Sequence, residues 1–444
     1  MDLIFGRWED ISGNPLPPDN GQLLPQPPPS LTLGRDSMLD LLLWAGFLVA
    51  CVFFVGAPLW VFLSHFFLVE IPSGISHPKK LRLYHCIFEL LLTWGRILEK
   101  TNICSMGQFV RFVHDLVPLT KDPDVVVTDL HFGTIPVKLY QPRSSCSTLR
   151  TGILFYHGGG GLLGSLKTHH GICLILCKES DSVVLSVGYR KMPEYKYPVM
   201  FHDCMAATVY FLKSLSAFGV DPARVVVCGD SMGGGLSVLL CQQLLKSPHL
   251  PKIRAQMVIY PVLHGLDFQS PANQQNNVPL LPRNFAIYCL MTYLNINPSW
   301  KRDMETGANL PPEIHEKYRK WLDHGNIPER FKQRGYRQKP VLPMNDLAYE
   351  ETRLVLDPMI CPLVAEDEVM SQMPEAFIVS CEYDYLRDHS LLYKKRLEDL
   401  GIPVTWLYVE DGFHGSLGTI DTIFFYFPCS RKIMNGMVDF IKQL

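Results

Sequence analysis

This 444-residue chain is poor in charge: only 19% of its residues are Asp, Glu, Lys or Arg, and the formal net charge is -2. A soluble domain usually carries about 25% charged residues. A net charge this close to zero provides no excess of basic residues to bind phosphates, so we expect no nucleic-acid partner. Hydrophobic residues make up 47% of the sequence, which excludes a largely disordered protein.

Cysteine patterns that bind metals are also missing. The 13 cysteines are too sparse for a disulfide scaffold, and no Cys-x-x-Cys sequence occurs. Cys173 and Cys177 stand four apart in an expected helix, which is typical of small buried side chains on one face. His169 and His170 could suggest a pair of metal ligands, but no cluster of Cys and His partners lies nearby, and we interpret them as surface residues. We therefore predict no metal.

Two N-terminal segments differ from the remainder of the chain. Residues 1–37 are rich in proline, which blocks helices and central strands, so we expect an extended leader, with Met38 as an alternative start. Residues 41–63 contain no charge. A helix of that length reaches ~35 Å and crosses a ~30 Å hydrocarbon core. We predict that residues 38–65 form a single membrane anchor.

The orientation of this anchor is left open by the charges beside it. Arg7 and Arg35 precede it, whereas Lys79, Lys80 and Arg82 follow it. The positive-inside rule then leans weakly towards a cytosolic C-terminal side. No Asn-x-Ser/Thr glycosylation sequence occurs that would indicate the other side.

Beyond the anchor, short apolar strands alternate with helices. This alternation predicts an α/β domain over residues 66–444, built on a mostly parallel sheet that is covered on both faces. Two regions do not follow this alternation, and we expect them to form a helical cap: residues 66–118 and part of 262–350. The expected strands are residues 125–132 and 135–140 as a hairpin, then 153–156, 182–187, 224–228, 255–260, 376–380 and 404–409.

A nucleophile is indicated by Gly229-Asp230-Ser231-Met232-Gly233, a G-x-S-x-G sequence between an apolar strand and an apolar helical stretch. The glycines are needed because the turn is sharp and a Cβ would clash with the neighbouring backbone. Such a turn lifts Ser231 above the carboxyl edge of the sheet, at a helix N-terminus that favours developing negative charge. We predict that Ser231 is the nucleophile.

A second motif, His157-Gly158-Gly159-Gly160-Gly161, follows the strand at 153–156. When a serine attacks a carbonyl, an oxyanion forms, and fixed backbone N–H groups must stabilise it. A phosphate cradle is the alternative, but the GK[ST] sequence and the acidic dinucleotide partner are missing. We predict an oxyanion hole at these residues, with His157 shaping the loop. The N–H group of Met232 would be a further donor.

The serine needs a base and the base needs an acid, in the chain order Ser, acid, His. His414 lies just after the strand at 404–409, and an imidazole pKa of ~6.5 suits proton transfer near neutral pH. For the acid, the strand at 376–380 is followed by Glu382, Asp384 and Asp388. We favour Asp384, because Glu382 is nearer the strand and Asp388 is placed to cap the next helix.

Four motifs in this chain, HGGG, GDSMGG, YDYLRD and EDGFHG, together resemble those of the arylacetamide deacetylase family. This family is a branch of the α/β-hydrolases that includes hormone-sensitive lipase. The resemblance covers about residues 38–444 and implies the α/β-hydrolase fold, with Asp384 and His414 completing the triad. It also implies a signal-anchor with the catalytic domain in the endoplasmic reticulum lumen, opposite to the charge count.

Two positions depart from the family pattern. Met232 stands where the family usually has alanine, so we expect an altered substrate preference with the backbone donor retained. The family's disulfide would pair Cys381 with a cysteine at the position of Leu162, so the resemblance does not extend to that disulfide.

Together these features predict a membrane-anchored serine hydrolase. It would cleave lipophilic carboxylic esters, or amides or acylglycerols, without a cofactor. The alternative is a catalytically silent, membrane-tethered binding protein on the same scaffold. Loss of the serine, the acid or the histidine would favour that alternative, and all three are present.

Overall fold

The computed structural model describes residues 35–67, 69–275 and 278–444. The predicted proline-rich leader lies outside these residues up to position 34. The chain divides into two compact units, one ending at Val55 and the other running from Gly56 to Leu444. The second unit contains every strand that the structure describes.

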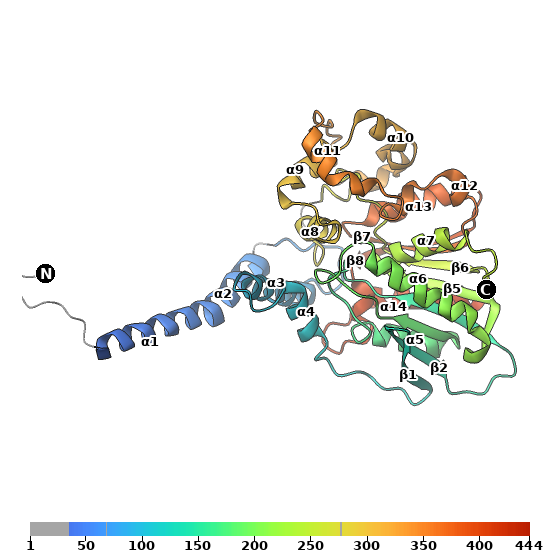
Figure 1. The fold of residues 1–444 in the computed structure, drawn as a ribbon, viewed down its shortest axis with the longest axis horizontal. Helices are drawn as coiled ribbons and strands as arrows, with labels where there is room; N and C mark the ends of the chain where they lie inside the picture. The colour runs from blue at the N-terminus through green and yellow to red at the C-terminus, as the bar shows by residue number, and fades with distance from the viewer. Residues whose placement is uncertain (1–34, 68, 276–277) are drawn as a thin grey trace, which may run out of the picture. The chain divides into compact units, whose positions relative to one another are not determined.

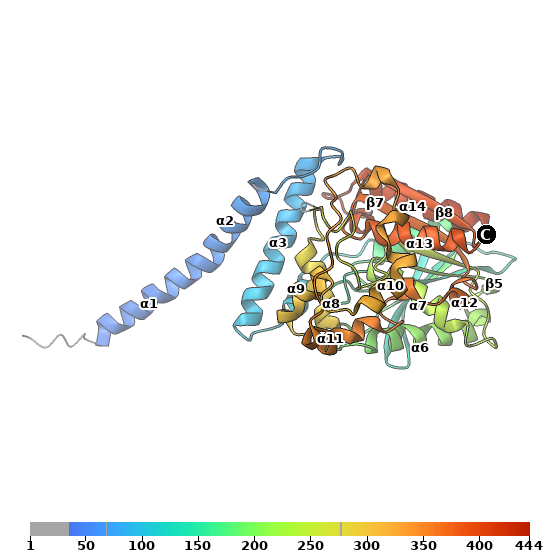
Figure 2. The same cartoon turned by 90° about the horizontal axis from the view of Figure 1, so that it is seen from above.

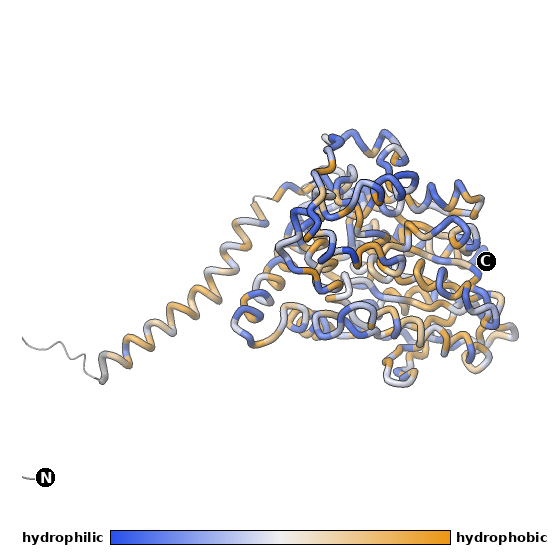
Figure 3. The backbone as a smooth tube through the Cα atoms, turned by 45° about the horizontal axis from the view of Figure 1, so that its top comes forward, coloured by the Kyte–Doolittle hydropathy of each residue, from blue (hydrophilic) through white to orange (hydrophobic). Residues whose placement is uncertain are grey.

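One helix among the described residues is long and apolar enough to cross a membrane. It runs over Met38–Phe67, 30 residues, and contains the predicted segment 41–63. At ~1.5 Å per residue it extends ~45 Å. In Figure 3 most of its length has the colour of hydrophobic residues. It comprises most of α1 (Arg35–Cys51), a π turn (Val52–Gly56), α2 (Ala57–Val61) and a second π turn (Phe62–Phe67).

The second unit is built around an eight-stranded sheet with the order β1-β2-β4-β3-β5-β6-β7-β8. The β1–β2 and β2–β4 pairs are antiparallel and all the others are parallel. The prediction of a mostly parallel α/β sheet is therefore confirmed. The strands are β1 (Val125–Phe132), β2 (Ile135–Pro142), β3 (Arg150–Tyr156), β4 (Val183–Val187), β5 (Val220–Asp230), β6 (Ala255–Ile259), β7 (Glu375–Tyr383) and β8 (Val404–Phe413).

Helices cover both faces of the sheet (Figure 1). In β3, Ile153 and Phe155 belong to one apolar core and Leu154 and Tyr156 to the other, because successive strand side chains point to opposite faces. The core with Ile153 includes α5 (His170–Ser180) and α14 (Pro428–Gln443). The other core includes α6 (Val199–Lys213), α7 (Met232–Leu244) and α13 (Arg387–Asp399).

Most of the remaining helices begin in the two regions for which a cap is expected, and α12 follows the second of these regions. In both views, α8 to α11 gather into one group (Figures 1 and 2). The helix α3 packs against α4. The bounds are α3 (Pro78–Lys100), α4 (Met106–His114), α8 (Arg283–Leu294), α9 (Lys301–Thr306), α10 (Pro312–Leu322), α11 (Asp346–Thr352) and α12 (Asp367–Met370).

The turn between β5 and α7 consists of the single residue Ser231. Ser231 occupies the turn with φ 53° and ψ -117°, a conformation that costs on the order of 1–3 kcal/mol for a residue with a side chain. Gly233 follows so close to β3 that a Cβ would overlap the carbonyl oxygen of Tyr156. Close packing of the turn against β3 therefore maintains the strained conformation.

We expect Gly233→Ala to lower the free energy of unfolding by about 3 kcal/mol, because backbone atoms that cannot rotate away would have to shift. Thermal unfolding of the detergent-solubilised protein, followed by circular dichroism, measures this. Gly418→Ala is the matched control, since a Cβ there meets no atom within 4 Å. Equal melting temperatures for the two variants would contradict the expectation.

Candidate active site

Three side chains from the carboxyl edge of the sheet form one hydrogen-bonded chain. The Oγ atom of Ser231 lies 2.8 Å from Nε2 of His414. The Nδ1 atom of His414 lies 3.0 Å from both carboxylate oxygens of Asp384. When Nδ1–H donates to the carboxylate, Nε2 keeps its lone pair and can accept the serine proton. All three residues are buried, and Asp384 is fully so.

The three acidic residues at the end of β7 and just after it have different partners. Glu382 forms ion pairs with Arg387 and Arg334. Asp388 accepts a hydrogen bond from the same Arg387, at 3.0 Å. Of the three carboxylates, Asp384 alone contacts the imidazole, and it also accepts a 2.7 Å hydrogen bond from a backbone N–H two residues on.

One of the N–H groups predicted as oxyanion donors in the glycine loop already forms a hydrogen bond within the protein. The N–H group of Gly158 donates to Oδ1 of Asp230 at 2.8 Å, so it is not available to a substrate oxyanion. The N–H groups of Gly159, Gly160 and Met232 form no hydrogen bond with any residue that the structure describes. These three groups remain as candidate oxyanion donors.

His157 belongs to the scaffold of this loop. Its ring stacks on Tyr189 with 4.2 Å between centroids, and the Tyr189 hydroxyl donates to its carbonyl oxygen at 2.5 Å. Its Nδ1–H donates to the carbonyl oxygen of Gly158 at 2.9 Å. Burial holds the pKa of His157 well below its usual range, so this imidazole stays neutral.

His169 and His170 correct the sequence-based interpretation of surface histidines, because both are buried. Nε2 of His169 lies 3.2 Å from Oδ1 of Asp230, the same oxygen that accepts the Gly158 N–H. Nδ1 of His170 lies 3.0 Å from the hydroxyl of Tyr140. Both residues lie at the start of α5, the helix that follows the glycine loop and covers the sheet. This position indicated that they would be buried.

Tyr260 is a second site residue that sequence reasoning missed. It directly follows β6, at the same edge as Ser231, and has a φ of 37°. Its ring centroid lies 5.0 Å from that of His414, and its hydroxyl accepts a hydrogen bond from the N–H of Leu417 at 3.3 Å. A bulky residue that ends a central parallel strand was the signal for this position.

The two positions of the family's disulfide are occupied by Cys381 and Leu162. Cys381 is a buried free thiol, and Leu162 is buried. All 13 cysteines lie in the part of the chain that the structure describes, and each is free.

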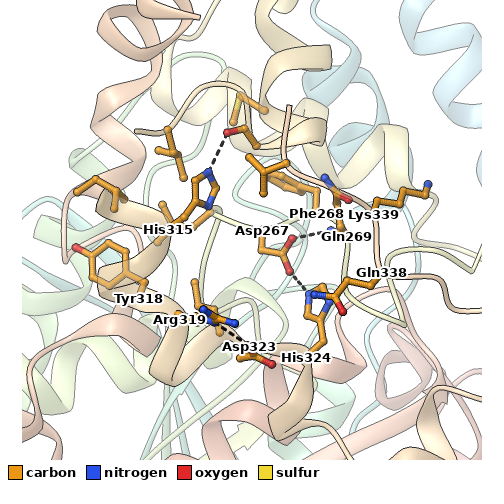
Figure 4. A pocket seen from close by; sticks show the side chains of 17 residues that line it. Asp267, Phe268, Gln269, His315, Tyr318, Arg319, Asp323, His324, Gln338 and Lys339 are labelled. Carbon is orange, nitrogen blue, oxygen red and sulfur yellow. Dashed lines mark hydrogen bonds and ion pairs between the residues drawn. The ribbon is translucent and has the colours of Figure 1, made fainter. Parts of the chain in front are cut away.

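A cavity of about 170 Å³ lies in the region of α9 and α10 and is separate from the three catalytic candidates (Figure 4). Its lining includes Asp267, whose carboxylate lies 2.6 Å from Nε2 of His324. His315 points towards the backbone of Gly307, where its Nε2 lies 3.0 Å from the carbonyl oxygen. Ser231, Asp384 and His414 are not among the lining residues.

Comparison with known proteins agrees with this architecture. The family model described as alpha/beta hydrolase fold matches residues 153–308 and 322–418. Among solved structures, carboxyl esterase 2 of the fungus Tuber melanosporum superposes with a TM-score of 0.56 at 22% identity. That alignment covers 73% of this chain and 88% of the esterase. The fold is therefore that of the α/β-hydrolases.

Two human proteins are much closer in sequence. Arylacetamide deacetylase-like 3 is 62% identical over 89% of this chain and 97% of its own length. Arylacetamide deacetylase-like 4 is 51% identical over 90% of this chain and 99% of its own length. The chain belongs to the arylacetamide deacetylase-like family of α/β-hydrolases, as its motifs indicated.

Two further imidazoles are buried close to the site. The rings of His264 and His389 stack with 4.0 Å between centroids. Burial lowers the pKa of His264 to about 4 and holds that of His389 well below its usual range. Nδ1 of His389 accepts a 3.0 Å hydrogen bond from the N–H of Leu263, which requires its lone pair.

We expect acid to destabilise the protein in part through His389. Its folded-state pKa is lowered, so the unfolded chain binds the proton first, and stability falls as the pH drops below ~6.5. At pH 5.5 this residue alone accounts for about 1.4 kcal/mol. His389→Gln should remove that part of the loss between pH 7.5 and 5.5. Parallel stability profiles for the two proteins would contradict this.

Proposed function

We propose that this protein is a membrane-anchored serine hydrolase that cleaves carboxylic esters. One observation carries the proposal: the Ser231 hydroxyl lies 2.8 Å from an imidazole whose other nitrogen lies 3.0 Å from a buried carboxylate. Carboxylic amides and acylglycerols present the same acyl carbon to the serine and belong to the same proposed substrate class. The names of the two human relatives and of the fungal esterase support this reading.

The proposed reaction has two steps. Ser231 attacks the acyl carbon while His414 takes its proton and passes it to the leaving alcohol, so an acyl-enzyme forms as the ester bond breaks. Water then attacks the acyl-enzyme, gives its proton to His414, and releases the acid as the proton returns to Ser231. Asp384 orients the imidazole and stabilises its charged form. No cofactor enters this proposal.

The oxyanion formed in each step needs donors that already point towards it. We assign this role to the N–H groups of Gly159, Gly160 and Met232, each of which lacks another partner among the described residues. Losing one such donor typically raises the barrier by about 2.7–4 kcal/mol. The Met232 donor also stands at the N-terminus of α7, where the helix dipole favours negative charge.

Met232 is the residue that we associate with substrate preference. Its side chain is partly buried and reaches towards Gly161 of the glycine loop. Alanine at this position would leave more room beside the proposed acyl site. We therefore assign to Met232 a restriction on the substrate's acyl group that the usual alanine of the family does not impose.

Covalent labelling with a fluorophosphonate tests the proposed function. The probe reacts with an activated serine, so we expect the folded protein to be labelled and Ser231→Ala to remain unlabelled. A catalytically silent binding protein would show no labelling of the folded wild type. Equal labelling of wild type and Ser231→Ala would contradict the assignment of the nucleophile.

The acid can be tested separately. Asp384→Asn should lower kcat by about 10⁴-fold, because the asparagine no longer holds the imidazole in the required tautomer. Glu382→Gln and Asp388→Asn are matched controls that change neighbouring carboxylates bound to Arg387, and each should retain most of the turnover. Near-normal turnover in Asp384→Asn with loss in either control would show that the acid is misassigned.

For location, we propose that the helix Met38–Phe67 is a single-pass anchor and that the catalytic unit lies in the lumen of the endoplasmic reticulum. The length and composition of this helix support the anchor. The family resemblance supports the lumenal side, whereas the flanking charges favour the cytosol weakly.

Because the chain has no natural glycosylation sequence, one substitution can report its orientation. Ser145→Asn creates such a sequence with Ser147, in an exposed loop before β3. We expect this variant to gain a glycan that endoglycosidase H removes when it is expressed in mammalian cells. Ser145→Asn combined with Ser147→Ala is the control. An unmodified Ser145→Asn protein would favour the cytosolic orientation.

A further inference from the structure

Three side chains with metal-binding atoms meet outside the candidate active site. His65 lies in the π turn that ends the apolar helix, and His85 and Glu89 lie in α3. One ligand atom from each of the three falls within 4.8 Å of the others. All three residues belong to the second unit, which begins at Gly56.

The local structure turns these side chains towards one another. His85 and Glu89 are four residues apart, which puts both on one face of α3. His65 comes from a π turn, a widened helical turn that is frequent at functional sites. Arg82 fixes the two segments close together by donating to the carbonyl oxygens of Phe66 and Val69.

The spacing of the two imidazoles suits a tetrahedral ion. Nδ1 of His65 and Nε2 of His85 are 3.2 Å apart. Two nitrogens that each lie ~2.0–2.1 Å from one tetrahedral zinc ion are ~3.3 Å apart. The same separation also permits a hydrogen bond between the rings when no ion is bound.

The buried position of Glu89 favours a bound cation. Only 7% of this residue is exposed, and no hydrogen bond or ion pair joins it to another residue that the structure describes, although the charges of His65 and Arg96 act on it. A buried carboxylate without a partner is costly, and a divalent cation shared with two neutral imidazoles would remove that cost.

We propose that His65, His85 and Glu89 bind one Zn²⁺ ion that clamps the end of the helix Met38–Phe67 to α3. Two imidazole nitrogens and one carboxylate oxygen are a common zinc donor set, and water would complete the tetrahedron. In this site Nδ1 of His85 carries the ring proton. Its contact with the N–H of Leu280, at 3.5 Å the limit for a hydrogen bond, is then lost at little cost.

This site is independent of the proposed hydrolase activity. His65 is separated from the other two ligands by a loop and a helix start, so the sequence spacing resembles no zinc motif. The prediction of no metal from the sequence considered only Cys-x-x-Cys patterns and the adjacent histidines at 169 and 170.

The test uses the full-length protein in detergent micelles, stripped with EDTA and titrated with ZnCl₂ or CoCl₂. We expect one equivalent of Zn²⁺ per chain and a Co²⁺ complex with the visible absorption of tetrahedral coordination. His85→Gln and Glu89→Gln should each weaken zinc binding by more than about tenfold, since even the loss of a residue that only supports a metal ligand costs that much. Zinc should also raise the melting temperature of the wild type but not of these variants.

Glu99→Gln, on the exposed part of the same helix, and His131→Gln, on exposed β1, are the matched controls and should bind zinc as the wild type does. His65→Gln changes a more exposed ligand and replaces either buried variant if that variant fails to fold. The proposal is overturned if the wild type binds no stoichiometric zinc, or if the ligand variants bind it as tightly as the controls.

Discussion

The close approach of Gly233 to the carbonyl oxygen of Tyr156 is the constraint on which the candidate site depends. It allows the β5–α7 turn to pack directly against β3, and the packed turn holds Ser231 at φ 53°. In that conformation the hydroxyl lies 2.8 Å from an imidazole that is 183 residues away in the chain. The strain of the turn is offset by the buried core on both sides of β3 and β5.

The charge balance around Arg387 explains which carboxylate is left for the imidazole. This arginine is fully buried, and a buried guanidinium must be paired. Glu382 and Asp388 both pair with it, one from the end of β7 and one from the start of α13. Asp384 lies between them in sequence and does not pair with Arg387, so its oxygens can face His414.

A second layer of buried groups holds the glycine loop from behind. Asp230 accepts the Gly158 N–H and lies 3.2 Å from His169, while Tyr189 donates to the carbonyl oxygen of His157. Oxyanion donors are effective only when they are oriented before the reaction, because the free energy of reorienting them during the reaction would offset their stabilisation of the oxyanion. These contacts hold the backbone of the four-glycine loop in one orientation.

The sequence by itself predicted the order and approximate positions of the strands, the mostly parallel sheet and the family, because short-range patterns and chain order carry that information. The same patterns led to the prediction of Ser231, Asp384 and His414 as the triad. Sequence reasoning placed His169 at the surface and did not find Tyr260. Only the tertiary structure decided those points, along with the use of the Gly158 N–H by Asp230 and the meeting of His65 with His85. The physical reason is that burial and hydrogen bonding depend on contacts between segments that are far apart in the chain.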